Sequence, residues 1–230
     1  MKAIVVTDRA AEAAGITLAE RPEPTPAIND VVVEVHASGF VPAEWEWPST
    51  WVDRSGHDRA PAIIGHEFAG VVTSLGYGTT GLSLGQRVFG ITDWHRDGTL
   101  AEYAAVEARN LAPLPGDVDF TVGASLPMRG LTAWQGLFEH GRFQAGQSLL
   151  VHGAAGSVGF KAATASSRVE TLPMFVRSRP SRTRWTIVAR DLAGGFKIPR
   201  SQPKRDSCLD LACFAQALLE RDHTRRHPGG

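Results

Sequence analysis

Residues 149–160 read LLVHGAAGSVGF, and this stretch decides the fold of the second half of the sequence. The apolar run 149–151 predicts a strand, and the small residues after it predict a turn into a helix that begins at Ser157. Glycines at such a turn let the backbone approach a pyrophosphate, and the unpaired N–H groups of the helix N-terminus attract it. The spacing Gly153-x-x-Gly156-x-x-Gly159 is a variant of the dinucleotide-binding pattern G-x-G-x-x-G. Small residues at such a turn also serve ordinary packing, so this motif alone leaves both interpretations open.

The composition is that of an ordinary globular protein, with 43% hydrophobic and 21% charged residues in a chain of 230. This length accommodates one large domain or two small ones. The formal net charge is zero, which gives no indication of a polyanionic partner. The charge is unevenly distributed, however. Residues 1–160 hold 10 basic and 18 acidic side chains, a charge of −8, whereas residues 161–230 hold 14 and 6, a charge of +8.

The cysteines and the apolar runs indicate the compartment. The only two cysteines, Cys208 and Cys213, exclude a disulfide framework, and we expect a reducing, cytoplasmic location. The N-terminus has no long apolar core of a signal peptide, and no apolar run approaches the ~18 residues of a membrane span. The arginine-rich last part carries no nucleic-acid recognition motif. We therefore expect neither a membrane nor a nucleic-acid partner.

Local patterns divide the chain into a strand-rich first half and a more helical second half. Short runs rich in β-branched or apolar residues predict strands near residues 3–6, 28–35 and 100–106. Helical patterning begins near residue 119, where Asp119 or Thr121 is the expected N-cap. Residues 161–230 are rich in Arg, Ser and Pro, and they show little periodicity apart from a helical face between Leu209 and Leu218.

Five segments follow one another in an informative order: GHEFAGVV, GLSLGQRVFG, GTLAEYAAV, LPMRGLTAWQGL and LLVHGAAGSVGF. In this order they resemble landmarks of the medium-chain dehydrogenase/reductase superfamily, and most of all its zinc-lacking quinone oxidoreductase branch. The resemblance runs from residue 1 to about residue 159. It implies a mixed fold, in which a GroES-like β-rich domain is followed by the start of an α/β Rossmann dinucleotide-binding domain.

The resemblance also implies domain limits. We expect a GroES-like catalytic and substrate domain at 1–124, an incomplete Rossmann cofactor-binding domain at 125–180, and a divergent basic segment at 181–230, for which disorder is one expectation. The likeness stops after Gly159, and fewer residues follow than a complete Rossmann domain needs. The change of charge and composition there suggests a truncated or out-of-frame continuation of a longer enzyme.

The implied activity is hydride transfer from a nicotinamide cofactor to a quinone, an enone or a related conjugated carbonyl. The branch usually takes NADPH, so NADPH is expected in preference to NADH, and Arg177 and Arg179 lie at a suitable distance to bind its 2′-phosphate. The resemblance places the cofactor contacts at Thr132, Gly153, Ala154, Ala155, Gly156, Ser157, Val158 and Gly159. The expected substrate pocket contains Val41, Trp45, Trp94 and His95, because indole faces suit flat conjugated molecules. The oligomeric state is open, and a homo-oligomer is one expectation.

A catalytic zinc needs three protein ligands, and the sequence does not supply them. The cysteines of zinc-dependent relatives fall at Val41 and Met128, whose side chains are not ligands of that kind. His66 and Glu67 match the histidine motif of those relatives, but His66 is also explained as a hydrogen-bonded residue at a strand start. We therefore expect no metal. The sequence identifies no catalytic side chain: Glu44 and His95 each either donate or orient a proton or lie on the solvated surface.

Three functions compete on this evidence. The first is a zinc-independent, NAD(P)H-dependent oxidoreductase, with its activity affected by the divergent end. The second is a catalytically inactive GroES-like module that binds a partner or forms oligomers. The third is a metal-dependent alcohol dehydrogenase that uses His66.

Overall fold

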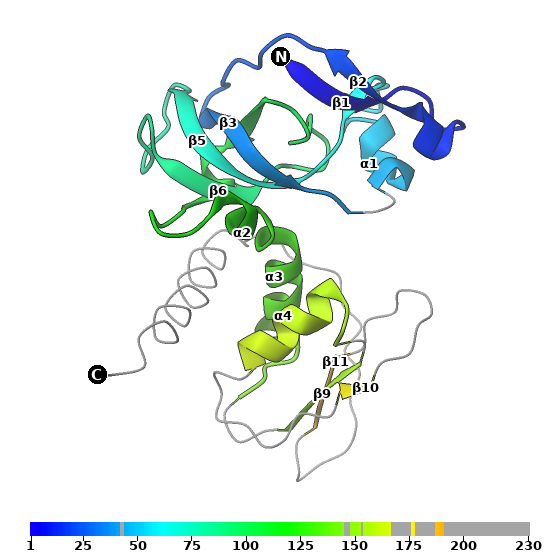
Figure 1. The fold of residues 1–230 in the computed structure, drawn as a ribbon, viewed down its shortest axis with the longest axis vertical. Helices are drawn as coiled ribbons and strands as arrows, with labels where there is room; N and C mark the ends of the chain where they lie inside the picture. The colour runs from blue at the N-terminus through cyan, green and yellow to red at the C-terminus, as the bar shows by residue number, and fades with distance from the viewer. Residues whose placement is uncertain (42–43, 145–147, 153, 167–175, 178–186, 191–230) are drawn as a thin grey trace. The chain divides into compact units, whose positions relative to one another are not determined.

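The computed structural model describes residues 1–41, 44–144, 148–152, 154–166, 176–177 and 187–190 (Figure 1). The chain divides into two compact units, Met1–Met128 and Arg129–Gly230. The expected domain limits at residues 124 and 180 stay a prediction. The expected helical face between Leu209 and Leu218 lies outside the described residues.

The first unit is built on antiparallel sheets, as the strand-rich sequence predicts (Figure 1). A five-stranded sheet has the order β7-β3-β5-β6-β8. Its strands are β3 (Asp30–Gly39), β5 (Glu67–Leu75), β6 (Arg87–Ile91), β7 (Tyr103–Glu107) and β8 (Leu111–Pro113). A three-stranded sheet has the order β2-β1-β4, with β1 (Lys2–Val6), β2 (Ile16–Glu20) and β4 (Ala62–Ile63). The expected β-rich first domain is therefore confirmed.

Alternation along the strands produces the core of the large sheet. Successive side chains of a strand point to opposite faces, so one face can be apolar throughout. Val31 and Val33 on β3 are fully buried and pack with Phe68 on β5, Val88 on β6 and Val106 on β7. This face holds the large sheet together, because burying a side chain such as Val or Phe stabilises the fold by about 1.5–3 kcal/mol.

Short helices connect the strands of the first unit. They are η1 (Glu12–Gly15), η2 (Glu44–Glu46), α1 (Pro48–Trp51), η3 (Ala108–Asn110) and α2 (Phe120–Ala124). The helix α2 packs against β3 and β5. Asp119 is its N-cap and accepts a hydrogen bond of 2.7 Å from the backbone N–H of Thr121, which confirms Asp119 and not Thr121 as the cap.

The second unit contains the strand and helix that the glycine-rich stretch predicts. After α3 (Pro127–Trp134), which begins at the end of the first unit, come the π-helical segment η4 (Gln135–His140), β9 (Ser148–His152) and α4 (Ser157–Ser166). The core of this unit is made of Leu137, Phe143, Val151 and the small side chains of α4, Ala162 and Ala165. Strand β9 and helix α4 both begin within a residue of the expected positions.

Strand β9 has two neighbours of opposite direction. The strand β10 (Val176–Arg177) runs parallel to β9, with Val176 opposite Val151, as in a strand–helix–strand unit. The strand β11 (Ile187–Arg190) runs antiparallel to β9, with Ile187 opposite Val151. The sequence did not predict β11, and a uniformly parallel Rossmann sheet has no antiparallel neighbour at this position. Among the described residues, no helix combines the length and the apolar character that crossing a bilayer requires.

Candidate functional site

A buried carboxylate joins two loops of the first unit. Glu44, in η2, has no exposed surface. Its Oε1 accepts a hydrogen bond of 3.0 Å from the backbone N–H of Val41, and its Oε2 accepts one of 2.7 Å from the backbone N–H of Gly65. Gly65 has φ +87°, a conformation that favours glycine. The expectation that Glu44 could lie on the solvated surface is therefore wrong, since its oxygens are committed to backbone donors.

His66 extends this network into the interior of the unit. The imidazole is 2% exposed, and its Nδ1 lies 3.3 Å from Glu44 Oε2. A carboxylate only accepts hydrogen bonds, so the proton of this contact belongs to Nδ1, a tautomer inferred from the partner. The expectation of a hydrogen-bonded histidine at a strand start is confirmed for this nitrogen. The other nitrogen, Nε2, is buried without a hydrogen-bond partner among the described residues.

Two indoles surround the His66 ring. Trp94 lies with its ring centroid 5.0 Å from that of His66, and Trp47 lies at 5.7 Å. The indoles meet each other edge to face at 5.4 Å, a favourable arrangement for aromatic rings. Trp94 remains 37% exposed, so it separates the imidazole from solvent. The result is an aromatic enclosure around one end of the Glu44–His66 pair.

Charged side chains hold the loop that carries Trp94. The Arg59 guanidinium donates to the carbonyl oxygen of Trp94 at 3.2 Å, and also to that of Ser49. Burial lowers the pKa of Arg59 below its ordinary value, while nearby aspartates, chiefly Asp97, oppose this shift. Arg54 donates to the carboxylate of Asp93, one residue before Trp94. The backbone at Trp94 is therefore anchored although its indole is partly exposed.

Glu67, the next residue after His66, belongs to a different set of contacts. It is fully buried, and its Oε2 accepts a hydrogen bond of 3.1 Å from the backbone N–H of Met128 in the first turn of α3. A carboxylate is favourable at a helix N-terminus, where N–H groups lack intrahelical partners. Gly39 leaves room for this side chain, because a Cβ there would lie 2.3 Å from Glu67 Oε1.

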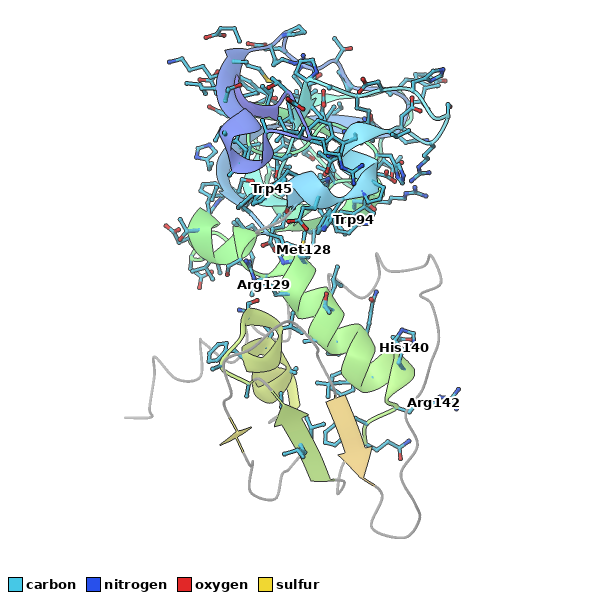
Figure 2. All side chains as sticks on the ribbon, turned by 90° about the vertical axis from the view of Figure 1, so that its right-hand side faces the viewer. Trp45, Trp94, Met128, Arg129, His140 and Arg142 are labelled. Carbon is cyan, nitrogen blue, oxygen red and sulfur yellow. The ribbon has the colours of Figure 1, made fainter. Side chains whose placement is uncertain are left out.

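The structure separates the four predicted substrate-pocket residues. It brings the backbone of Val41 and the indole of Trp94 to the Glu44–His66 pair. Trp45 instead stacks on Phe40 at 6.3 Å and packs against the apolar cluster of β1 and β4. The Nδ1 of His95 lies 3.7 Å from a carboxylate oxygen of Asp93. Figure 2 shows Trp45, Trp94 and Met128 toward the same end of the first unit.

Residues that the sequence did not select complete the site. Trp47 encloses His66, and Thr92 donates its backbone N–H to the carbonyl oxygen of His66 at 2.9 Å. The sequence contains one signal for Trp47, its place in a tryptophan-rich loop, but none that separates it from Trp45. Thr92 has no local signal, because its relation to His66 depends on the pairing of β5 with β6.

The predicted cofactor-binding residues lie in the second unit, apart from Gly153, which is outside the described residues. Ala154 is buried, Ser157 is exposed, and the first intrahelical bond of α4 runs from Phe160 N–H to the Gly156 carbonyl oxygen at 2.8 Å. Helix geometry then leaves the N–H groups of residues 157–159 without intrahelical acceptors. Thr132 is exposed on α3. The assignment of these residues to a cofactor stays a prediction.

No group of three or more His, Cys, Asp or Glu side chains in the described part of the chain has an arrangement that could hold a metal ion. Around His66, the contacting residues are one carboxylate and two indoles.

Comparisons with known proteins agree with this architecture. Residues 27–116 match the alcohol dehydrogenase GroES-like domain. The quinone oxidoreductase of Rattus norvegicus is 37% identical over 139 residues, which cover 59% of this chain and 40% of that protein.

Solved structures give the same result. An alcohol dehydrogenase superfamily protein from Novosphingobium aromaticivorans superimposes with a TM-score of 0.68 at 32% identity, covering 78% of this chain and 54% of that one. The quinone oxidoreductase from Coxiella burnetii superimposes with a TM-score of 0.65 at 25% identity, covering 76% and 55%. Residues 27–116 therefore match the GroES-like domain of alcohol dehydrogenases, and in sequence and fold the chain is similar to quinone oxidoreductases and an alcohol dehydrogenase superfamily protein, about half of whose length it spans.

Proposed function

We propose that the protein is a zinc-independent, NAD(P)H-dependent oxidoreductase that transfers hydride to a quinone, an enone or a related conjugated carbonyl. The observation that supports this proposal is a strand–turn–helix succession. Strand β9 leads through a short turn with Gly156 into helix α4, whose first N–H groups lack intrahelical acceptors. The names of the relatives, quinone oxidoreductases among them, supply the reaction type.

The chain's own residues account for binding and orientation. The backbone N–H groups of residues 157–159 would hold the pyrophosphate, with help from the partial positive charge of the α4 N-terminus. Gly156 and Ala155 keep bulky side chains away from this anion. The bound nicotinamide supplies the hydride, and the protein supplies alignment and exclusion of water.

Zinc independence is proposed from the side chains that stand at the ligand positions. Val41 contributes only its backbone N–H, which is bonded to Glu44, and Met128 contributes its N–H to Glu67. Only His66 would remain as a ligand, and its Nδ1 is engaged by Glu44. Three protein ligands with an open fourth position, which catalytic zinc requires, are therefore not supplied.

NADPH is proposed in preference to NADH. In Rossmann domains the residues after the second strand bind the adenosine ribose, and an arginine there accepts a 2′-phosphate. Arg177 ends β10, the strand parallel to β9. The other candidate, Arg179, lies outside the described residues. We also propose a cytoplasmic location, which suits a reduced nicotinamide cofactor and the two late cysteines.

The test is a fluorescence titration of the full chain with NADPH. We expect saturable binding, and we expect Ser157→Asp to weaken it by at least about tenfold, because the new carboxylate repels the pyrophosphate. Asp is favourable in the first turn of a helix, so this variant should keep its fold. The control is Ser55→Asp, the same substitution at an exposed position of the first unit. Absence of NADPH binding at millimolar cofactor would refute the proposal.

The second candidate, an inactive GroES-like module that binds a partner or oligomerises, is favoured by one observation. Strand β11 occupies one side of β9 in the antiparallel direction, where a Rossmann sheet has a parallel strand. If the second unit cannot bind a dinucleotide for this reason, the protein's remaining function would be partner binding or oligomerisation by the first unit. Failure to bind NADPH, combined with concentration-dependent oligomers in analytical ultracentrifugation, would support this candidate.

A further inference from the structure

The strand β2 has an exposed edge. It lies at one end of the three-stranded sheet, beside β1, and no other strand of the described residues pairs with it. Its middle side chain, Leu18, is 70% exposed, and its neighbours Thr17 and Glu20 are exposed as well. An edge strand presents backbone N–H and C=O groups to any strand that can pair with them. The edge of β2 is therefore a candidate interaction surface.

Hydrogen bonds at the end of the ladder show which backbone groups of β2 face outward. The N–H of Arg21 donates to the carbonyl oxygen of Met1 at 2.8 Å, and the amine of Met1 donates to that of Arg21 at 2.7 Å. Bonded and non-bonded pairs alternate along an antiparallel ladder, so the next bonded pair on β2 is that of Ala19. The residues between the bonded pairs, Leu18 and Glu20, therefore direct their backbone groups away from β1.

The neighbouring strand confirms this alternation. Ile4, which lies opposite Leu18, directs its N–H away from β2 and donates to the carbonyl oxygen of Leu100 at 2.8 Å. At the start of β2, the N–H of Ile16 is bonded to the carbonyl oxygen of Ala13, so Ile16 offers only its own carbonyl oxygen to a new partner. The edge is thus short and is centred on Leu18.

The strand β2 lacks the features that keep sheet edges from pairing. Natural edges are protected by short length, proline, bulges or lysine. Among the other described edges of the first unit, β4 has two residues, β8 has three and ends at Pro113, and the side chains of β7 are buried or half-buried. In contrast, β2 pairs with β1 over five consecutive residues without a bulge, and it contains neither lysine nor proline. Its edge is therefore the one most open to an added strand.

We propose that β2 is a dimerisation edge, which pairs antiparallel with β2 of a second copy of this chain across a two-fold axis at Leu18. A two-fold interface needs a self-complementary surface, and the outward-facing positions are symmetric about Leu18. Leu18 of each copy exchanges two backbone hydrogen bonds with Leu18 of the other. The N–H of Glu20 donates to the carbonyl oxygen of Ile16 in the second copy, and the reverse bond forms by symmetry. The two exposed leucine side chains then bury each other.

Charge favours a second copy as the occupant of this edge. Like charges that lie directly opposite each other on neighbouring strands are destabilising. The only charged side chain of β2 is Glu20, which has Lys2 opposite it on β1 and would have Ile16 of the second copy on its other side. No two like charges therefore meet in this register. Pro22 and Pro24 follow the strand and have no N–H to donate, so the pairing is limited to a few residues and the dimer is weak.

The experiment is sedimentation equilibrium of the full chain between about 10 µM and 1 mM, where a small interface is measurable. We expect dimers that form with increasing concentration. Leu18→Lys should raise the dimer Kd at least about tenfold, because it places two ammonium groups opposite each other at the axis. Thr17→Lys is the matched control, since Thr17 is exposed on the same strand but would lie opposite Ala19 of the second copy. Both variants change exposed positions and should unfold thermally like the wild type.

Hydrogen exchange of the wild type gives a second measurement that needs no variant. The amides of Leu18 and Glu20 should exchange slowly only at high concentration, whereas that of Ala19, bonded to β1, should be protected at all concentrations. Protection of Leu18 at every concentration would overturn the proposal, because another part of the same chain would then cover the edge. A chain that stays monomeric, with Leu18 exchanging freely, would leave the edge to a different partner and also overturn it. Equal Kd values for Leu18→Lys and Thr17→Lys would overturn it as well. The proposal stands apart from the oxidoreductase function, since NADPH binding tests only the latter.

Discussion

Substitution of Glu44 by glutamine should destabilise the first unit strongly. The carboxylate accepts from Val41 N–H at 3.0 Å with one oxygen, and from Gly65 N–H at 2.7 Å and His66 Nδ1 with the other. A glutamine amide has only one acceptor oxygen, so whichever way it turns, its NH2 group faces at least one backbone N–H. Each hydrogen bond to a charged group contributes about 1.5–3 kcal/mol, and the unpaired N–H adds a desolvation cost. We expect a loss of about 2–5 kcal/mol.

The measurement is urea unfolding of the full chain, followed by tryptophan fluorescence. A loss of this size is a large fraction of the ~5–15 kcal/mol that a typical domain has. Glu46→Gln is the matched control, because Glu46 is exposed in the same turn η2. We expect it to unfold like the wild type. If Glu44→Gln is within about 0.5 kcal/mol of Glu46→Gln, the buried carboxylate does not hold the two loops together and the assignment of its hydrogen bonds is wrong.

Three further predictions concern other contacts of the first unit. Gly39→Ala places a Cβ 2.3 Å from Glu67 Oε1 and should cost about 1–3 kcal/mol in urea unfolding; an unchanged midpoint would show that Glu67 has room to move. Arg96→Ala leaves the carboxylate of Asp30, 3% exposed, without the guanidinium that binds both its oxygens at 3.1 and 2.5 Å. Because the Arg96 side chain is itself 32% exposed, we expect a loss of about 2–3 kcal/mol, below the full cost of breaking a buried pair, with Arg96→Lys as the comparison. Two hydrogen bonds lower the pKa of Asp119 below its ordinary 3.8: first that from the Thr121 hydroxyl, then that from the Thr121 N–H. The ionised Asp119 therefore stabilises the folded protein above pH 3.8. This stabilisation is lost as the pH falls through the lowered pKa that Asp119 has in the folded protein. Asp119→Ala should therefore be less stable than the wild type at neutral pH and converge with it in acid, as followed by circular dichroism; a difference that persists in acid would contradict the assignment.

The parts of the fold that the sequence predicts are those whose causes are local. The strand β9 and the start of α4 follow from an apolar run and a glycine-rich turn within one short stretch. The cap of α2 follows from an aspartate two residues before its donor, Thr121. Strand β11 depends on distant residues instead. It is only four residues long, and it is a strand because it pairs with β9. Such a pairing cannot be derived from the pattern of the four residues themselves.

The candidate site shows the same limit at the level of side chains. Carboxylates are almost never fully buried without partners, so a sequence containing Glu44 suggests a surface or a cleft position. Its burial depends on the N–H of Gly65, 21 residues away, and on the left-handed backbone of that glycine. Thr92 likewise joins His66 only through the register of two strands. Sequence patterns indicate which residue types carry chemistry, whereas the register decides which of them meet.

The adjacent pair His66-Glu67 illustrates what the register decides. Neighbouring residues in extended backbone project to opposite sides, and here each has its own partners. His66 meets Glu44 and the two indoles, while Glu67 bonds the first turn of α3 at Met128. The two residues that resemble a metal-binding motif in the sequence therefore belong to separate sets of contacts. Substitution of Glu67 should disturb the start of α3, and substitution of Glu44 should disturb the imidazole of His66, so the two halves of the motif can be perturbed independently.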